Sequence, residues 1–287
     1  MISTIVQQIL NSFVLGSVYA LITIGITMIY GTLRILHIAN AGVYVAGAYT
    51  GLLFYLLTHN FLLAVIGAMF FCGLIGLAIE RFIYRPMIPL PRAVALIASV
   101  GLFIFMSDLA RILAGPLQRP FPLDLGQRVN IGEISLSRID ILIYVFTFII
   151  FAILWFIMNK TKIGYAIRAI SQDLDASKIM GINVERSIQF VFFIGSAISA
   201  VGGILVAILY NAVYPSMGDV FSYKALALIV IGGFGSLLGA VLAGLLLGLT
   251  ETFITTYTHV PLSREGIAMF FLIVLILFRP AGLFGKE

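Results

Sequence analysis

The chain has 287 residues, of which 61% are hydrophobic and 10% are charged. A water-soluble domain carries roughly 25% charged residues, so this chain could not cover its surface with polar groups. Disorder is excluded as well, because disordered segments combine low hydrophobicity with high charge. The composition therefore predicts an integral membrane protein. The net charge of +5 is spread over loops without a basic tail, so we expect no nucleic-acid partner.

The N-terminus and the cysteine content limit the function further. The first charged residue is Arg34, so the basic segment that opens a cleavable signal peptide is missing, and we expect the first apolar segment to stay in the protein. The single cysteine, Cys72, lies in an apolar run and offers neither a disulfide framework nor a thiolate metal site.

Charge-poor windows long enough to cross a bilayer predict about eight helical segments. We expect helices because the runs are continuous, whereas a membrane barrel alternates apolar and polar residues. The expected fold is an all-α polytopic membrane protein that forms one transmembrane domain over residues 1–287, without a soluble domain between the segments. The segments are Val6–Tyr30, Ala41–Thr58, Phe61–Ile79, Ala93–Ala114, Ile141–Met158, Ile188–Val213, Ala225–Tyr257 and Gly266–Phe278.

Lysine and arginine in the loops set the orientation, because cytoplasmic loops are enriched in both. Glu80–Arg92 and Lys160–Ser187 are basic, and we place both in the cytoplasm. Gly115–Asp140 dilutes its arginines with acidic residues and is expected on the extracytoplasmic side. The tail Arg279–Glu287 is expected inside, so an odd number of crossings must separate it from Ile188–Val213.

The segment Tyr223–Tyr257 is too long for one simple span and contains three glycines within four positions, Gly232, Gly233 and Gly235. We expect a broken or re-entrant helix, with a short half over Lys224–Ile231 and a longer helix from about Leu237. Irregular backbone at membrane depth is tolerated only beside protein or a watery cavity, so the break is expected to face inward.

Small residues recur every fourth position in two segments, which allows helix backbones to approach closely. Such rows are compatible with packing inside one subunit, and also with a moving interface or a contact to a second subunit. The rows are Gly195, Ser199, Gly203 and Ala207, and then Ser236, Ala240, Gly244 and Gly248.

The cytoplasmic stretch Lys160–Ser187 predicts one short amphipathic helix. Thr161 can cap its start and Gly181 can end it. Its apolar face could pack on the membrane surface or the subunit's own helices, or it could dock into a groove of a soluble subunit. The apolar face comprises Ile163, Ile167, Ile170 and Leu174, and the opposite face comprises Arg168, Gln172 and Asp175.

Ionisable residues inside apolar segments are candidates for function. Asp108 and Arg111 lie three apart on one helix and are expected to neutralise each other. Glu251 follows a charge-free run and could face a cavity, where it would suit an ion-coupled carrier. His37 and His59 flank an apolar segment and are expected at the membrane interface, and His259 precedes Pro261 in a loop; none has a metal partner at ligand spacing. We expect no metal and no cofactor in this chain.

An intramembrane enzyme is the third class considered. Ser236 follows Gly-Phe-Gly, as in a serine protease loop, but the sequence places no histidine as its base. The glycines after Gly233 lack the lysine of a phosphate-binding loop, so any ATP must be bound by a partner.

Several stretches together resemble a known family, and their order and spacing cover nearly the whole chain. The chain resembles the shorter, "H"-type permease subunit of bacterial high-affinity branched-chain amino acid ABC transporters. One stretch departs from the family: residues 37–42 read His-Ile-Ala-Asn-Ala-Gly, where the family usually has Asn-Phe-Ala-His-Gly and an acidic residue. The matching stretches are Leu15–Leu21, Tyr30–Gly31, Gly47–Tyr49, Glu80–Arg81, Tyr84–Pro86, Gly164–Ala169, Gly181–Asn183, Gly232–Ala240 and Arg279–Gly285.

The resemblance implies a multi-pass permease in the bacterial cytoplasmic (inner) membrane. It would pair with a second, homologous permease, two cytoplasmic ATPases and an extracytoplasmic solute-binding protein. The implied substrate is a branched-chain amino acid, with other hydrophobic amino acids, urea and short amides as alternatives. Residues that would couple the permease to the ATPases are Gly164, Arg168, Ala169, Asp173, Ala176 and Gly181. Residues that would line the translocation path are Asn40, Gly42, Tyr44, Gly232, Gly233, Gly235, Ser236 and Glu251.

Overall fold

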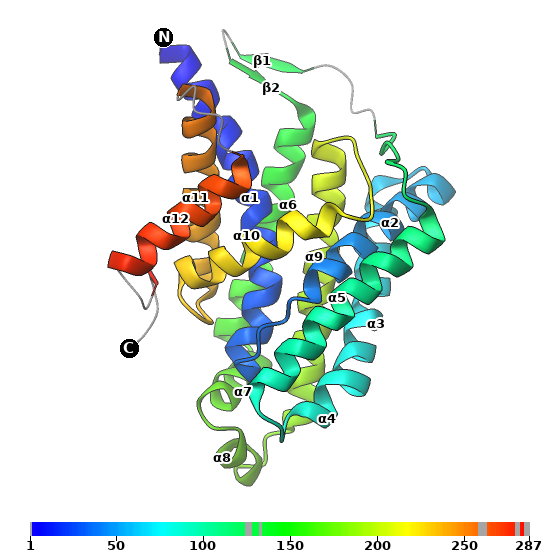
Figure 1. Cartoon of the computed structure of the whole chain (residues 1–287), viewed down its shortest axis with the longest axis vertical. Helices are drawn as coiled ribbons and strands as arrows, with labels where there is room; N and C mark the ends of the chain where they lie inside the picture. The colour runs from blue at the N-terminus through cyan, green and yellow to red at the C-terminus, as the bar shows by residue number, and fades with distance from the viewer. Residues whose placement is uncertain (1, 124–127, 132–133, 258–262, 279–281, 284–287) are drawn as a thin grey trace.

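The structure is a computed structural model that describes residues 2–123, 128–131, 134–257, 263–278 and 282–283 (Figure 1). Its described part is helical apart from one short hairpin. The elements are α1 (Ile2–Leu33), α2 (Asn40–Thr58), α3 (Phe61–Ile79), the π-helix η1 (Glu80–Tyr84), α4 (Arg85–Met87), α5 (Arg92–Ala114), β1 (Val129–Ile131), β2 (Ile134–Leu136), α6 (Arg138–Lys160), α7 (Lys162–Gln172), α8 (Leu174–Ile179), α9 (Val184–Leu209), α10 (Met217–Gly232), α11 (Leu237–Tyr257) and α12 (Arg264–Phe278).

Seven stretches within these elements are long and apolar enough to cross a membrane: residues of α1, α2, α5, α6, α9 and α11, and the continuous run Phe61–Met87 formed by α3, η1 and α4. All eight predicted segments are helical, which confirms the all-α membrane fold. The hairpin of β1 and β2, in which Val129 pairs with Leu136, was not predicted; it lies within the loop assigned to the extracytoplasmic side.

The predicted break in the C-terminal half is confirmed. α10 ends at Gly232, Gly233 and Gly235 have positive φ angles of 90° and 81°, and α11 begins at Leu237. Glycine is suited to these positions because it lacks the Cβ that disfavours positive φ. The helix before the break, α10, is longer than the predicted Lys224–Ile231, because the charge of Lys224 was expected to mark its start. That charge is instead neutralised inside the protein, so the helix extends back to Met217.

α1 and α9 form the centre of the molecule. α1 packs against α9 and α11, and α9 also packs against α2 and α3 (Figure 1). Both predicted rows of small residues lie in these contacts: Gly195 faces the carbonyl of Gly25 on α1, and Gly244 faces the backbone of Ala20 on α1. The rows therefore serve packing inside the subunit, where small residues let backbones approach.

The two ends of the molecule differ in what they carry. The N-terminus and the β1–β2 hairpin lie at the top of Figure 1, and α7 and α8 lie at the bottom. Because the α7–α8 segment is the basic one, the positive-inside rule assigns the bottom to the cytoplasm. We call the two ends the hairpin end and the α7–α8 end.

Candidate functional site

The α7–α8 segment is held against the bundle by its first turn. Thr161 caps α7, its hydroxyl accepting a hydrogen bond from the backbone N–H of Gly164 at 3.3 Å. A Cβ at Gly164 would collide with the carbonyls of Ile157 and Met158, so only glycine fits there. Arg168 donates to the Met158 carbonyl, and its guanidinium lies 4.6 Å from the centre of the Tyr165 ring. These contacts fix α7 at the end of α6.

The predicted single amphipathic helix is wrong in one respect: the structure has two helices, divided at Asp173. This residue is extended, and its carboxylate caps α8 by accepting from the N–H groups of Asp175 and Ala176, each at 2.9 Å. The side chain competes for the backbone that a continuous helix would use.

The apolar face of α7 packs on the subunit itself. Ile167 and Ile170 are buried against α1, α6 and α9, whereas Ile163, expected on the same face, is 41% exposed. A face already covered by its own subunit leaves no room for a partner. The free apolar surface lies farther along, at the end of α8.

The tip of α8 was missed by the sequence reasoning. Ile179 and Met180 are 86% and 83% exposed, directly before Gly181, whose φ of 80° ends the segment. Ala169 is half-buried, while Asp173 and Ala176 are exposed, so the predicted coupling residues surround this tip rather than form it. The sequence does carry a signal for this tip: two large apolar residues, Ile179 and Met180, stand between a polar helix and the glycine that ends it.

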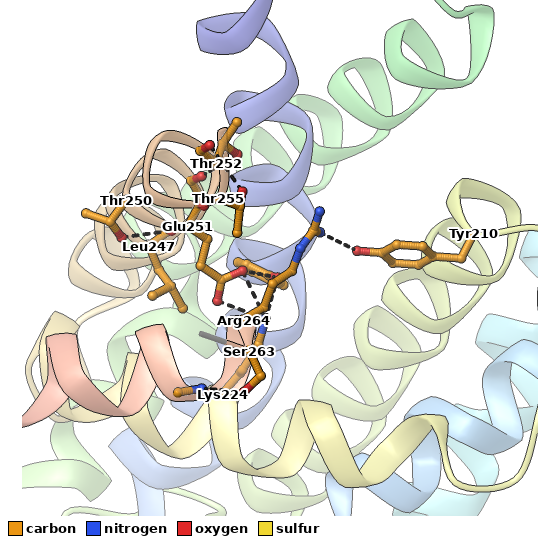
Figure 2. Close-up of polar contacts among 12 residues, drawn as sticks. Tyr210, Lys224, Leu247, Thr250, Glu251, Thr252, Thr255, Ser263 and Arg264 are labelled. Carbon is orange, nitrogen blue, oxygen red and sulfur yellow. Dashed lines mark hydrogen bonds and ion pairs between the residues drawn. The ribbon is translucent and has the colours of Figure 1, made fainter. Parts of the chain in front are cut away.

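A buried polar cluster lies nearer the hairpin end. The ammonium of Lys224 on α10 lies 2.8 Å and 3.0 Å from the two carboxylate oxygens of Glu251 on α11. The hydroxyl of Tyr19 on α1 donates to Glu251 at 2.7 Å and accepts from Lys224 at 2.7 Å. Figure 2 shows this cluster with Arg264 beside it. Isolated charges at this depth are costly, and mutual pairing with a third hydrogen-bonding group offsets the desolvation.

A cavity of about 240 Å³ adjoins this cluster. It is lined by both polar and apolar side chains, and Arg264 at the start of α12 donates to the hydroxyl of Tyr210 at 3.2 Å (Figure 2). The sequence reasoning found Glu251 but missed the rest, because the partners lie far away in the sequence. The cavity is lined by Tyr19, Val206, Tyr210, Ala212, Tyr214, Met217, Val220, Phe221, Lys224 and Arg264.

Three further predicted path residues lie on α2. Tyr44 is buried and stacks on Phe221 of the cavity wall, with 4.5 Å between ring centres. Asn40 is also buried, and its amide donates to the hydroxyl of Ser199 on α9 at 2.6 Å. Gly42 lies against Met106 of α5. The structure thus brings Tyr44 beside the cavity, whereas Asn40 and Gly42 serve helix contacts.

The glycine turn lies in a different place from these residues. Phe234 packs on the ring of Tyr30 near the end of α1, and a second cavity of about 320 Å³ joins Gly235 and Ser236 to Arg168 of α7. Gly232 and Gly233 are buried at this turn. The hydroxyl of Ser236 accepts from the N–H of Gly239 at 3.0 Å and so caps α11.

The expectation that this turn faces inward at membrane depth stays a prediction. The turn lies at the α7–α8 end, where Gly235 packs against the backbone of Gly31 on α1 and Phe234 is 46% exposed. The predicted path residues therefore form two separate groups, one on α2 and around the Lys224–Glu251 pair, and the other at the glycine turn.

The remaining titratable candidates are structural. His37 is buried rather than interfacial, because its Nδ1 shares a hydrogen bond of 2.7 Å with the hydroxyl of Tyr84. His59 is exposed at the end of α2, and Asp108 pairs with Arg111 at 2.8 Å as predicted. His259 lies outside the described residues. Within the described ranges, no three His, Cys, Asp or Glu side chains gather where a metal ion could bind.

Comparisons with known proteins agree over nearly the whole chain. A family model described as "Branched-chain amino acid transport system / permease component" matches residues 8–278. The high-affinity branched-chain amino acid transport system permease protein BraD of Pseudomonas aeruginosa is 34% identical, over 98% of this chain and 95% of that protein. The corresponding LivH of Escherichia coli K12 is 31% identical, with the same shares covered. Among solved structures, PsaBC from Streptococcus pneumoniae aligns with a TM-score of 0.53 and 14% identity, over 96% of this chain and 92% of that chain, which is a similarity of fold.

Proposed function

Because the chain belongs to the branched-chain amino acid transport system permease family, we propose that it is the membrane permease of an ATP-driven importer of branched-chain amino acids. Its location would be the cytoplasmic membrane of a bacterium. The chain itself would not be an enzyme, since the hydrolysis of ATP would belong to partner subunits.

The observation that carries this proposal is the exposed apolar tip of α8. Ile179 and Met180 are more than four-fifths exposed at the end that the basic residues assign to the cytoplasm. Large apolar side chains held outside the membrane need a protein surface to cover them, and a short helix inserted into a groove is a common solution. We propose that this tip docks into one of two cytoplasmic ATPase subunits.

Motion of the ATPases would reach the bundle through α7. Gly164 and Arg168 tie α7 to the end of α6, and Ile167 and Ile170 bury it against α1 and α9. A force on α8 would therefore act on the two central helices. In this proposal a second, homologous permease completes the path, and an extracytoplasmic binding protein delivers the substrate at the hairpin end.

The pairing of Glu251 argues against the alternative of an ion-coupled carrier. A coupling carboxylate must gain and lose a cation during the cycle. Here Lys224 holds both oxygens of Glu251, and Tyr19 donates a further hydrogen bond.

The test is reconstitution of the complete transporter in liposomes, with uptake of labelled leucine and hydrolysis of ATP measured together. We expect Ile179→Ser, Arg168→Ala and Gly164→Val to reduce uptake at least about tenfold per ATP hydrolysed, while each protein still inserts. Arg81→Ala, an exposed basic residue at the same end but outside α7 and α8, is the control. Normal coupling in all three variants would refute the docking role.

A second measurement separates the function classes. We expect the chain alone to move no amino acid under a proton or sodium gradient, and gradient-driven uptake would favour the carrier. Competition by urea and acetamide, compared with isoleucine and valine, tests the substrate class in the complete transporter.

A further inference from the structure

The cavity beside Lys224 is lined by both cationic and aliphatic side chains. The cationic ones are Lys224 and Arg264, and the aliphatic ones include Val206, Met217 and Val220. A pocket with this combination fits a small molecule that carries an anionic group next to an aliphatic chain. Its volume of about 240 Å³ lies below the roughly 300–1,000 Å³ that is usual for drug-sized ligands, which limits it to a small one.

The position of the cavity fits entry from the extracytoplasmic side. Tyr210 and Tyr214 belong to the loop that follows α9, and Arg264 begins α12, at the hairpin end of the bundle. The same loop reaches the segment after α5, where Arg119 and Val213 bond to each other through their backbones at 2.8 Å and 2.9 Å. A substrate released at this end would meet the two central helices in this cavity, through Tyr19 of α1 and Val206 of α9.

Of the two cationic side chains that line the cavity, Arg264 is the one with free donors. An ammonium group carries three donors. Those of Lys224 face both oxygens of Glu251 and the hydroxyl of Tyr19, so Lys224 lines the cavity without a free donor. Arg264 donates to Tyr210 and, among the described side chains, forms no ion pair. A guanidinium can bind a carboxylate through two parallel hydrogen bonds, so the rim of the cavity is suited to a carboxylate.

A buried hydroxyl beside the cavity also lacks a partner. Tyr44 is fully buried, and its hydroxyl has no hydrogen bond to any described residue. Its ring packs at a tilt against Phe221 of the cavity wall, with 4.5 Å between the ring centres. Tyr44 is not one of the lining residues, so the hydroxyls that the cavity itself offers are those of Tyr19, Tyr210 and Tyr214. An amino acid ammonium could donate to the hydroxyl oxygens gathered here.

We propose that this cavity is the first subsite for the transported molecule in the permease, and that it binds an α-amino acid through its carboxylate. Arg264 receives the carboxylate, the hydroxyls of the lining tyrosines accept from the ammonium, and Val206, Met217 and Val220 contact the aliphatic side chain. This inference rests on the proposed function, because it takes a hydrophobic amino acid as the substrate. It adds selectivity at the permease itself, beyond what a binding protein supplies.

The experiment measures protection of a cysteine placed in the cavity. Val220→Cys lies half-buried in the wall, and the native Cys72 is fully buried, so a chain without the new cysteine gives the background. The complete transporter in liposomes, without binding protein, is treated with the small neutral reagent methyl methanethiosulfonate. The rate of modification is measured against increasing L-leucine, 4-methylpentanoate, which lacks the ammonium, and isoamylamine, which lacks the carboxylate. Tyr214→Cys provides a second reporting position.

We expect L-leucine to slow modification in a saturable way, 4-methylpentanoate to do so more weakly, and isoamylamine to have no effect. Arg264→Gln should raise the half-protecting leucine concentration about tenfold, as for the loss of one charge-assisted hydrogen bond. Arg264 is exposed at the rim, so its replacement leaves the packing intact. Arg111→Gln is the matched control, since Arg111 is an exposed arginine of α5 outside the cavity lining.

Different results would refute the subsite and the proposed function. If the complete transporter takes up leucine but leucine protects neither cysteine, the subsite is wrong and the proposed function stands. The subsite is also wrong if Arg264→Gln and Arg111→Gln give the same half-protecting concentration, or if isoamylamine protects as well as leucine. If leucine protects but is not taken up with ATP and binding protein present, the subsite stands and the proposed function is wrong.

Discussion

Two pairs of membrane helices, similar in hydropathy, occupy opposite environments in this protein. In the most apolar stretches of α1 and α9, 89% of the residues are buried inside the subunit, whereas the corresponding share is 17% in α5 and α6. Lipid tails are as apolar as leucine, so hydrophobicity gives a helix no preference for the centre over the periphery. Hydropathy therefore identifies the membrane spans, but it does not tell which spans lie at the centre of the bundle and which lie at its periphery.

Small and polar residues make the difference between the two pairs. In α1, Gly16 and Gly25 lie against the backbones of neighbouring helices and Gly31 against the turn at Gly235, while α6 contains no glycine. α5 contains one glycine, Gly101, which faces open space. Close backbone contact and buried hydrogen bonds thus stabilise the centre of the bundle, and variants that remove them should lower the free energy of unfolding more than variants at the periphery.

The largest effect is expected at the buried ion pair that joins α10 and α11 to α1. Lys224→Met leaves Glu251 charged and buried, which should lower the free energy of unfolding by about 3–5 kcal/mol. Arg111→Met breaks the exposed pair on α5 and should cost less than about 1 kcal/mol. Denaturant unfolding of the purified chain in detergent, followed by circular dichroism, measures both.

The double variant Lys224→Met, Glu251→Leu separates pairing from packing. It removes both charges, so most of the lost stability should return. Equal losses for the single and double variants would mean that the pair contributes nothing through its charges.

A smaller effect is expected from filling a helix contact. A side chain at Gly203 of α9 meets the backbone carbonyl of Tyr44 on α2, so Gly203→Leu should cost about 3 kcal/mol through forced separation of the helices. Gly101→Leu on α5 is the control and should change stability by no more than about 0.5 kcal/mol. Thermal unfolding of the two variants side by side decides whether close packing distinguishes the pairs of helices.

The next effect concerns one hydrogen bond between the central helix α9 and its neighbour α2. Ser199→Ala removes the acceptor of the Asn40 amide, and leaving that buried donor unpaired should cost about 1–2 kcal/mol. Ser196 lies on the same helix, and its hydroxyl has no partner among the described residues, so Ser196→Ala should be nearly neutral. The comparison fails if the two variants unfold at the same denaturant concentration.

The sequence predicts the spans of this fold well, because continuous apolar runs and glycine turns are local signals. The start of α11 at Leu237 and the break after Gly232 follow from such signals. Lys224 shows the limit of the method. A charged residue at this position predicts the end of a membrane span. Its partners become visible only in the three-dimensional structure, because Glu251 lies 27 residues later in the chain and Tyr19 lies 205 residues earlier.

The candidate site is less predictable than the fold for the same reason. Glu251 and Tyr44 were identified in the sequence, but the cavity beside them also needs Arg264 and Tyr210, which come from two other elements. At the opposite end, the apolar spacing of α7 predicts its helix correctly, yet the cap at Asp173 interrupts the continuation. Local competition between a side-chain cap and helical hydrogen bonds is decided by the surrounding structure.

The smallest effect is expected on the outer face of α6, and it tests what covers the periphery. Phe148 is 73% exposed, so Phe148→Ala should change the stability of the isolated chain by no more than about 0.5 kcal/mol. Phe192 of α9, fully buried against the rings of His37 and Tyr84, is the matched site where the same change is destabilising. The complete transporter gives a second result from the same variant. If Phe148→Ala leaves the chain stable but releases it from the assembled complex, as measured by co-purification, then α6 faces the second permease; if the complex survives, that face meets lipid.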